Sequence, residues 1–175
     1  MIAIVNADQN WGIGKNGDLL FPIPEDMRFF RETTLGKTVI MGSRTLLSFP
    51  GGQPLKNRSN IVLSRKAPHT PGVTVCGSLA ALQKALAGLA PDEVYVIGGE
   101  SVYRLLLPYC STALVTRVQK QGEADTFFPN LDRLEGWRLA GQSAPQQHQG
   151  IAYTFCTYNN TNVQPLHFTG EEQGR

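Results

Sequence analysis

Five short apolar runs constrain the fold of this chain more than any other feature of its sequence. Each run is rich in β-branched side chains and almost unbroken by charge, which is typical of strands buried on both faces of a parallel sheet. The runs are residues 2–5, 38–41, 60–63, 73–75 and 93–97. Parallel strands need long crossover connections, so we expect helices between them.

Helical patterns fall between these runs. Leucines at positions 79, 82, 86 and 89 mark one face of a helix, with Ser78 at its N-cap and Gly88 near its end. A second helix is expected over residues 100–107, where Pro108 stops it because proline lacks the N–H that a helix interior needs. These two helices are the expected crossovers.

The last part of the sheet follows a different pattern. Residues 113–118 and 151–158 are apolar or alternating, with no clear helix between them, which indicates closing antiparallel strands. We therefore expect an α/β fold: a central mixed, mostly parallel sheet of about eight strands, with an antiparallel C-terminal strand and helices on both faces. With 175 residues, 41% of them hydrophobic, the chain is expected to form one domain over residues 1–159. Polar composition predicts a weakly ordered tail at 160–175.

Charge and cysteine content exclude several classes of protein. The 16 basic and 14 acidic residues give a net charge of +2 without a basic block, which argues against nucleic-acid binding. The three cysteines Cys76, Cys110 and Cys156 suit small buried side chains in a reducing cytoplasm, and neither they nor the three histidines have metal-ligand spacing. No signal peptide and no apolar segment of 18 residues is evident, so we expect a cytoplasmic protein without a membrane partner.

Asp26 is the candidate chemical centre. If a helix begins just before it, Asp26, Phe30 and Thr33 share one helix face. An acid among Met27, Phe29 and Phe30 is expected to lose its hydration, which raises its pKa and suits it to hydrogen bonding in a dry pocket. The alternative is that Asp26 merely favours the positive end of the helix dipole.

Three strand ends carry groups that suit a phosphate ligand. The strand at 94–97 runs through Gly98 and Gly99 into a helix, and the strand at 38–41 is followed by the segment 42–45 with its glycine, serine, arginine and threonine. Ser64 and Arg65 end a third strand. Open α/β sheets bind ligands at the carboxyl ends of their strands, and helix N-termini offer free N–H groups to phosphates. Each junction alone is more often a plain tight turn, so their concurrence carries the inference.

Seven short motifs, taken together, resemble the dihydrofolate reductase family over about residues 2–158. They are G-I-G-K-N-G-D-L, P-x-D, V-I-M-G-x-x-T, R-x-N-I-V-L-S-R, V-I-G-G-x-x-V-Y, T-R-V and D-T-F-F-P. The resemblance implies reduction of 7,8-dihydrofolate to 5,6,7,8-tetrahydrofolate for one-carbon metabolism, with hydride transfer from NADPH to C6 and protonation at N5. It also implies a monomer that antifolates inhibit.

The resemblance assigns roles to individual residues. Asp26 would hold the 2-amino group and N3 of the pterin, Arg58 would bind the glutamate α-carboxylate, and Asp125 would support a mobile loop. The catalytic set is Asp26, Phe21 and Thr116. The substrate set is Ala7, Met27, Phe30, Phe49, Leu55, Arg58 and Ile97. The NADPH set is Ala7, Ile13, Asp18, Leu19, Gly42, Ser43, Arg44, Thr45, Leu63, Ser64, Arg65, Ile97, Gly98, Gly99, Ser101, Val102 and Tyr103.

Two departures from the family pattern keep alternatives open. Leu20 and Phe21 stand where the family most often has Pro-Trp, and a phenyl ring cannot donate the hydrogen bond that an indole N–H makes to a water. Ser43 and Arg44 stand where two basic residues are common. Another NADPH-dependent pterin or pyrimidine reductase, and a catalytically weak folate- or nucleotide-binding protein, therefore remain alternatives.

Overall fold

The computed structural model describes residues 1–67 and 69–167. The helices are α1 (Pro24–Thr34), α2 (Ser43–Ser48), α3 (Leu79–Ala85) and α4 (Glu100–Leu106), with 3-10 turns at Pro50–Gly52, Pro91–Glu93 and Leu107–Tyr109. The strands are β1 (Ile2–Ala7), β2 (Gly12–Lys15), β3 (Asp18–Leu19), β4 (Thr38–Met41), β5 (Ser59–Leu63), β6 (Val73–Cys76), β7 (Val94–Gly98), β8 (Thr112–Val118), β9 (Thr126–Phe127), β10 (Trp137–Gln142), β11 (Gln146–His148) and β12 (Ile151–Asn160).

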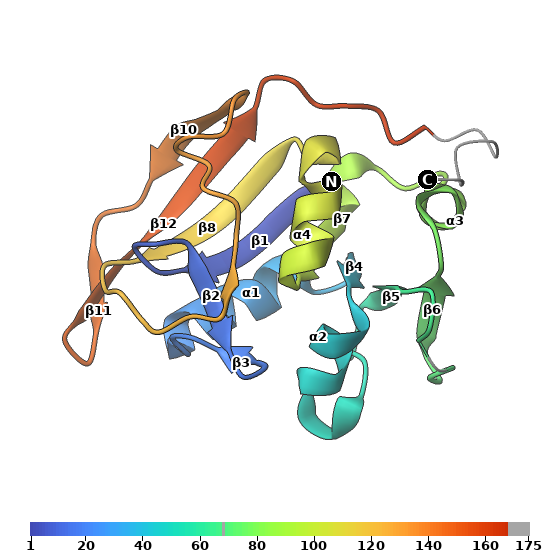
Figure 1. Cartoon of the computed structure of the whole chain (residues 1–175), viewed down its shortest axis with the longest axis horizontal. Coiled ribbons are helices and arrows are strands. Elements are labelled where there is room, and N and C mark those ends of the chain that lie inside the picture. The colour runs from blue at the N-terminus through green and yellow to red at the C-terminus, as the bar shows by residue number, and fades with distance from the viewer. Residues whose placement is uncertain (68, 168–175) are drawn as a thin grey trace.

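One large mixed sheet organises the molecule (Figure 1). Its strand order is β10-β12-β8-β1-β7-β4-β5-β6, with β11 paired to β12. The neighbouring pairs from β8 through β1, β7, β4 and β5 to β6 are all parallel. Strand β12 runs antiparallel to β8, and β10 antiparallel to β12. The predicted architecture, a mostly parallel sheet that finishes in antiparallel strands, is confirmed.

Helices cover both faces of this sheet because the central strands are apolar on both sides. In β1, Ala3 and Val5 belong to a core cluster that also contains residues of α3 and α4. The alternate residue Ile4 belongs to a second cluster that contains Leu46 of α2 and is packed by Phe30 of α1. Successive strand residues point to opposite faces, so α3 and α4 lie on one side and α1 and α2 on the other. Figure 1 shows α4 lying across one face beside β7.

Helix ends follow the sequence signals. Ser78 Oγ accepts a hydrogen bond from the Ala81 N–H at 3.1 Å, which caps α3 as predicted. Helix α4 ends at Leu106, and Pro108 lies in the 3-10 turn that follows it. Helix α1 begins at Pro24, so Asp26 sits in its first turn. The predicted helix positions are therefore confirmed, with α3 four residues shorter than its leucine pattern.

A small second sheet, of strand order β3-β2-β9, was not predicted from the sequence. Buried Asp8 fixes its base: Oδ1 accepts the N–H groups of Asn10 and Gly12, and Oδ2 accepts that of Gly122, each at 2.8 Å. These bonds join the end of β1, the start of β2 and the segment before β9. The segment containing β2 and β3 is thereby attached beside the carboxyl end of β1.

After β12 the chain runs on toward α3 without a helix or strand in residues 161–167 (Figure 1). The Gln164 N–H donates to Pro108 O at 2.9 Å, and Leu166 packs against the core. The rest of the predicted tail, residues 168–175, lies outside the described residues. All three cysteines are free and buried, as expected. Within residues 1–67 and 69–167, no helix is long and apolar enough to cross a membrane.

Candidate active site

The carboxylate of Asp26 lies between the first turn of α1 and the strands β1 and β8. Thr116 Oγ1 donates to Asp26 Oδ1 at 2.5 Å, and Asn6 Nδ2 donates to Oδ2 at 2.9 Å. Only 9% of Asp26 is exposed. Burial raises the pKa of its carboxyl group above the ordinary value, whereas the two hydrogen bonds favour the charged form and oppose the rise. The predicted desolvated carboxylate is confirmed.

Asp26 lies in the first turn of α1, where its negative charge also interacts favourably with the positive end of the helix dipole, as the alternative interpretation holds. That interpretation does not account for the two side-chain donors, which come from strands 20 and 90 residues away in the sequence. An acid that only stabilises a helix end needs no such donors, because water can solvate it equally well. The geometry therefore favours a carboxylate that is held in place for a ligand.

Asn6 is a site residue that the sequence reasoning missed. It precedes Ala7 in β1, and adjacent strand residues point to opposite faces. The Ala7 side chain is fully buried in the core cluster that contains Tyr103, while Asn6 reaches Asp26. Contact of Ala7 with a ligand is therefore restricted to its backbone. Tyr103, assigned to the cofactor from the motifs, is also in the core, where its hydroxyl donates to Ile4 O at 2.6 Å.

Phe21 forms part of the wall next to Asp26. Its ring packs against a small cluster made by Ile23, Val118 and Tyr153. Its carbonyl oxygen accepts a second hydrogen bond from Asn6 Nδ2, at 3.1 Å. The segment that leads into α1 is thus fastened to β1 at the level of Asp26.

Arg58 is held rigidly near the C-terminal end of α1. Its Nε donates to Thr34 Oγ1 at 3.1 Å, one terminal nitrogen donates to Lys56 O at 2.7 Å and the other to Arg31 O at 2.8 Å. A guanidinium has five N–H donors, so these contacts among the described residues leave one donor on each terminal nitrogen. Two such donors suit a carboxylate. Burial, and then the nearby charge of Arg31, lower the pKa of Arg58.

The predicted apolar pocket residues lie on the face of the sheet that α1 and α2 cover. The predicted pocket residues Phe30, Phe49, Leu55 and Ile97 are partly buried and pack against the cluster of β4, β5, β7 and α2. The backbone of Leu55 is fixed by Asn60, which accepts its N–H and donates to its carbonyl oxygen. Met27, predicted to help desolvate Asp26, is 51% exposed and contributes less than expected.

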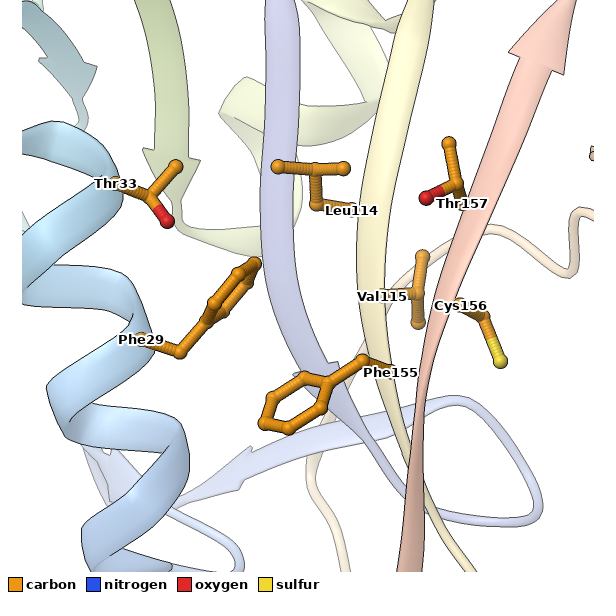
Figure 2. Close-up of a pocket in the computed structure, with 7 residues that line it drawn as sticks. All are labelled: Phe29, Thr33, Leu114, Val115, Phe155, Cys156 and Thr157. Carbon is orange, nitrogen blue, oxygen red and sulfur yellow. The ribbon is translucent and has the colours of Figure 1, made fainter. Parts of the chain in front are cut away.

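Phe29 and Thr33 point into a separate pocket of about 320 Å³ between α1 and the strands β8 and β12 (Figure 2). The Phe29 ring lies 4.9 Å from that of Phe155, measured between ring centroids. Thr33 shares this pocket with Phe29, about two helical turns from Asp26. Thr33 was expected to share a helix face with Asp26, and the pocket that it lines with Phe29 does not include Asp26.

The three glycine- and arginine-bearing junctions meet at one edge of the sheet, as predicted. Register pairs Met41 of β4 with Gly98 of β7 and with Val62 of β5, and the Gly42 N–H donates to Gly98 O at 2.8 Å. A Cβ atom at Gly98 would lie 3.3 Å from Thr45 Oγ1, and the φ of +138° at Gly98 suits only glycine. Glycine is therefore required at this junction, because of its backbone conformation and because the Thr45 side chain packs against it.

The cations at this edge are exposed. Arg44 follows Ser43, and Arg65 follows Ser64, whose hydroxyl accepts the Lys66 N–H at 3.2 Å. Neither Arg44 nor Arg65 forms an ion pair within the part of the chain that the structure describes. Over those same residues, no cluster of histidine, cysteine and acidic side chains could hold a metal ion. The edge thus presents exposed positive charge.

The predicted loop residues Asp18 and Leu19 are exposed in β3. Asp125 supports this hairpin, because its Oδ2 accepts the Asn16 N–H at 2.9 Å and its own N–H donates to Gly14 O at 2.9 Å. Ile13 and Leu63 pack against the core, and Ser101 and Val102 lie in the first turn of α4, exposed and buried respectively. Their predicted contacts with a cofactor remain predictions.

The site thus consists of a buried carboxylate held by two donors, a guanidinium held by three hydrogen bonds, and an edge of the α/β sheet with exposed cations. The family model described as dihydrofolate reductase matches residues 1–160. A dihydrofolate reductase from Bacillus subtilis is 35% identical over 167 residues, covering 93% of this chain and 96% of the relative. One from Neisseria gonorrhoeae is 38% identical over 152 residues, covering 86% and 91%.

The structure of Enterococcus faecalis dihydrofolate reductase, complexed with NADP(H) and RAB-propyl, superposes with a TM-score of 0.79 at 31% identity, covering 91% of this chain and 95% of that one. The chain belongs to the dihydrofolate reductase family. A bifunctional dihydrofolate reductase-thymidylate synthase of Glycine max is 36% identical over 173 residues, covering 89% of this chain. The chain spans about a third, 32%, of the length of that relative.

Proposed function

We propose that this chain reduces 7,8-dihydrofolate to 5,6,7,8-tetrahydrofolate, with hydride transfer from NADPH to C6 and protonation at N5. The observation that carries the proposal is the buried Asp26 carboxylate, held by Thr116 and Asn6 in the first turn of α1, with the remaining Arg58 donors near the C-terminal end of the same helix. Dihydrofolate has complementary groups at its two ends: the donors of the 2-amino group and N3, and a glutamate carboxylate.

NADPH fits the edge formed by the carboxyl ends of β4, β5 and β7. Gly98 leaves no room for a side chain beside Thr45, and Arg44 and Arg65 supply exposed cations for phosphates. Bound there, NADPH would supply the hydride. The exposed hairpin with Asp18 and Leu19 would close over its nicotinamide, supported by Asp125.

The protein's part in the reaction is electrostatic and positional. N5 of a dihydropterin is a weak base, and C6 becomes a better hydride acceptor when N5 carries a proton. In its charged form, the poorly hydrated Asp26 carboxylate stabilises the resulting positive charge more strongly than a carboxylate in water would. Phe30 and Phe49 exclude water from the pterin ring. Arg58 binds the glutamate carboxylate at the far end of the substrate and so fixes the position of the ring. The proton itself comes from a water, because Asp26 binds the opposite edge of the pterin.

The same proposal places the chain in the cytoplasm, acting as a monomer in one-carbon metabolism and inhibited by antifolates. Three free, buried cysteines suit a reducing compartment. Antifolates that carry a 2,4-diamino ring would compete for Asp26, because their ring donors match its acceptors.

The decisive experiment follows NADPH absorbance at about 340 nm during incubation with dihydrofolate. We expect absorbance loss that depends on both compounds and stops on addition of methotrexate. A chain that gains thermal stability with either ligand but turns over neither would instead be the binding protein. A related reductase with a smaller substrate would reduce dihydropterin or a pyrimidine as efficiently as dihydrofolate, and would make the clamped Arg58 superfluous.

Coenzyme choice depends on Arg65. We expect strong preference for NADPH over NADH, because Arg65, with Ser64 and Arg44, reaches the 2′-phosphate that only NADPH carries. A charge-assisted hydrogen bond of about 1.5–3 kcal/mol corresponds to roughly 10- to 150-fold in affinity. Arg65→Ala should therefore weaken NADPH binding by that factor and leave NADH binding nearly unchanged, as measured by fluorescence titration.

Arg138→Ala is the matched control for the charge removed, because Arg138 lies exposed on β10 at the other end of the sheet. It should change neither affinity. Equal loss of NADPH and NADH binding in Arg65→Ala would contradict the assignment of the 2′-phosphate to this residue.

Phe21→Trp tests the departure from the family pattern. An indole N–H at this position would hold a water for N5 protonation, so turnover should rise most at pH above neutral, by up to about tenfold, where protonation limits the rate. The measurement is single-turnover hydride transfer over a pH series. Because the Phe21 ring packs against Ile23, Val118 and Tyr153, the larger ring costs roughly 1–3 kcal/mol if these side chains cannot move. A pH profile identical to wild type in a stably folded variant would show that Phe21 is only a wall.

A further inference from the structure

We infer that Asn6 is a positioning residue for the reaction proposed above: its side-chain amide fixes the Asp26 carboxylate and fastens it to the segment that leads into α1. The inference rests on the proposed function for the meaning of the site. The contacts themselves are independent of it.

The amide of Asn6 has only one orientation that fits. Nδ2 donates to Asp26 Oδ2 at 2.9 Å and to Phe21 O at 3.1 Å. Both partners are pure acceptors when Asp26 is ionised, so a flipped amide would set its own oxygen against two oxygens. Both N–H groups of the Asn6 amide are thus used, one on the carboxylate and one on the backbone.

Asn6 and Thr116 hold the two oxygens of Asp26 from adjacent strands. They are register partners in the parallel pair β1 and β8, and each donates to a different oxygen. A carboxylate that accepts a hydrogen bond at each oxygen is restrained from rotating about its Cβ–Cγ bond. Each oxygen keeps lone pairs for a ligand, since an ionised carboxylate has about four acceptor sites in all. The pair therefore sets the plane in which a ligand must present its donors.

The second bond of Asn6 couples this carboxylate to the pocket wall. Phe21 lies just before α1, and its carbonyl oxygen shares the Asn6 amide with Asp26. Displacing the Phe21 backbone would pull on the same amide that orients Asp26. Because the Asn6 amide is neutral, it orients the carboxylate and leaves its negative charge uncompensated. A lysine at position 6 would compensate that charge.

The titration of Asp26 can be distinguished from the titrations of the ionisable groups around it. Tyr103 of α4 and Tyr153 of β12 face it, and burial raises the pKa of both phenols, so they stay neutral below about pH 9. On its own helix, Glu25 is exposed and lies 3.5 Å from His148 of β11. An Asp26→Asn variant identifies which carboxyl signal belongs to Asp26.

The test compares Asn6→Leu, Asn6→Asp and the control Asn160→Leu. Asn160 also donates its amide to a backbone carbonyl, that of Cys110, but far from Asp26. The readout is the titration midpoint of the Asp26 carboxyl in the ligand-free protein, followed by ¹³C NMR. Losing the Asn6 donor should move the midpoint upward by about one pH unit. Asn6→Asp should move it further, because two carboxylates at that distance cannot both ionise.

The acid limb of kcat/KM for dihydrofolate should move upward by the same interval as the NMR midpoint in each Asn6 variant, and should stay in place in Asn160→Leu. An unshifted midpoint in Asn6→Asp, which keeps the shape and should fold, would overturn the inference, as would shifts of equal size in the control. A wild-type chain that fails to reduce dihydrofolate would count against the proposed function, and the NMR titration would still decide whether Asn6 governs Asp26.

Discussion

Replacing Asp26 with asparagine is expected to lower kcat for dihydrofolate at neutral pH by at least about tenfold and up to about a thousandfold, with little change in NADPH affinity. The substitution keeps the shape of the side chain and most of its hydrogen bonding to Thr116, but removes the charge that stabilises a protonated pterin. Steady-state kinetics together with NADPH titration separate the two effects.

The same variant should be at least as stable as the parent. Folding raises the pKa of Asp26, so the folded state binds this proton more tightly than the unfolded chain does. Stability therefore falls as pH rises from the unfolded value of about 4 through the folded one. Asp26→Asn removes that loss, and its melting temperature should exceed that of wild type increasingly as pH rises over this interval.

Glu25→Gln is the matched control. Glu25 is the neighbouring acid in the same first turn of α1 but is exposed, so its loss should not change kcat appreciably. If Asp26→Asn retained near-normal turnover, or if it lowered the melting temperature as a lost helix-end charge would, Asp26 would belong to the helix terminus alone.

The parts of the fold that the sequence predicts are those set by local pattern. The apolar runs of β1, β4, β5 and β7 lie at their predicted places, because a strand covered on both faces can carry almost no charge. The run of β6 also lies at its predicted place, but β6 is an edge strand in which Thr74 and Val75 are exposed, so its predicted burial on both faces is wrong. The polar strand β10 was missed for the opposite reason: after Trp137 its residues are exposed, and they include arginine, glycine and glutamine. Strand β10 is held by backbone hydrogen bonds to β12. Backbone pairing does not require alternating hydrophobic side chains, so the sequence carries no strand pattern here.

The candidate site was predictable where one residue type at one position carries the chemistry. Asp26 stands out as an acid among apolar neighbours. Asn6 does not, because a single asparagine in an apolar strand becomes meaningful only when the sheet register sets it beside Thr116. Motif resemblance pointed to Ala7, one residue away, and a shift of one residue along a strand moves the side chain to the other face.

The second large effect is expected at Arg58. Arg58→Leu should raise KM for dihydrofolate by about 30- to 1000-fold while kcat changes little, because the two free donors bind a group remote from the reacting atoms. This corresponds to about 2–4 kcal/mol for a lost bidentate pair. With dihydropteroate, which lacks the glutamate, the variant and the wild type should have similar KM values.

Arg58 also braces the C-terminal end of α1, so the loss of packing must be separated from the loss of binding. Thr34→Val removes the oxygen that accepts the Nε hydrogen bond of Arg58 and keeps the guanidinium, at a position that is fully buried. It should raise KM for dihydrofolate far less than Arg58→Leu does, even if both lower the melting temperature. Equal increases in KM from the two substitutions, or an equal penalty with dihydropteroate, would show that Arg58 supports the helix and that the substrate carboxylate is bound elsewhere.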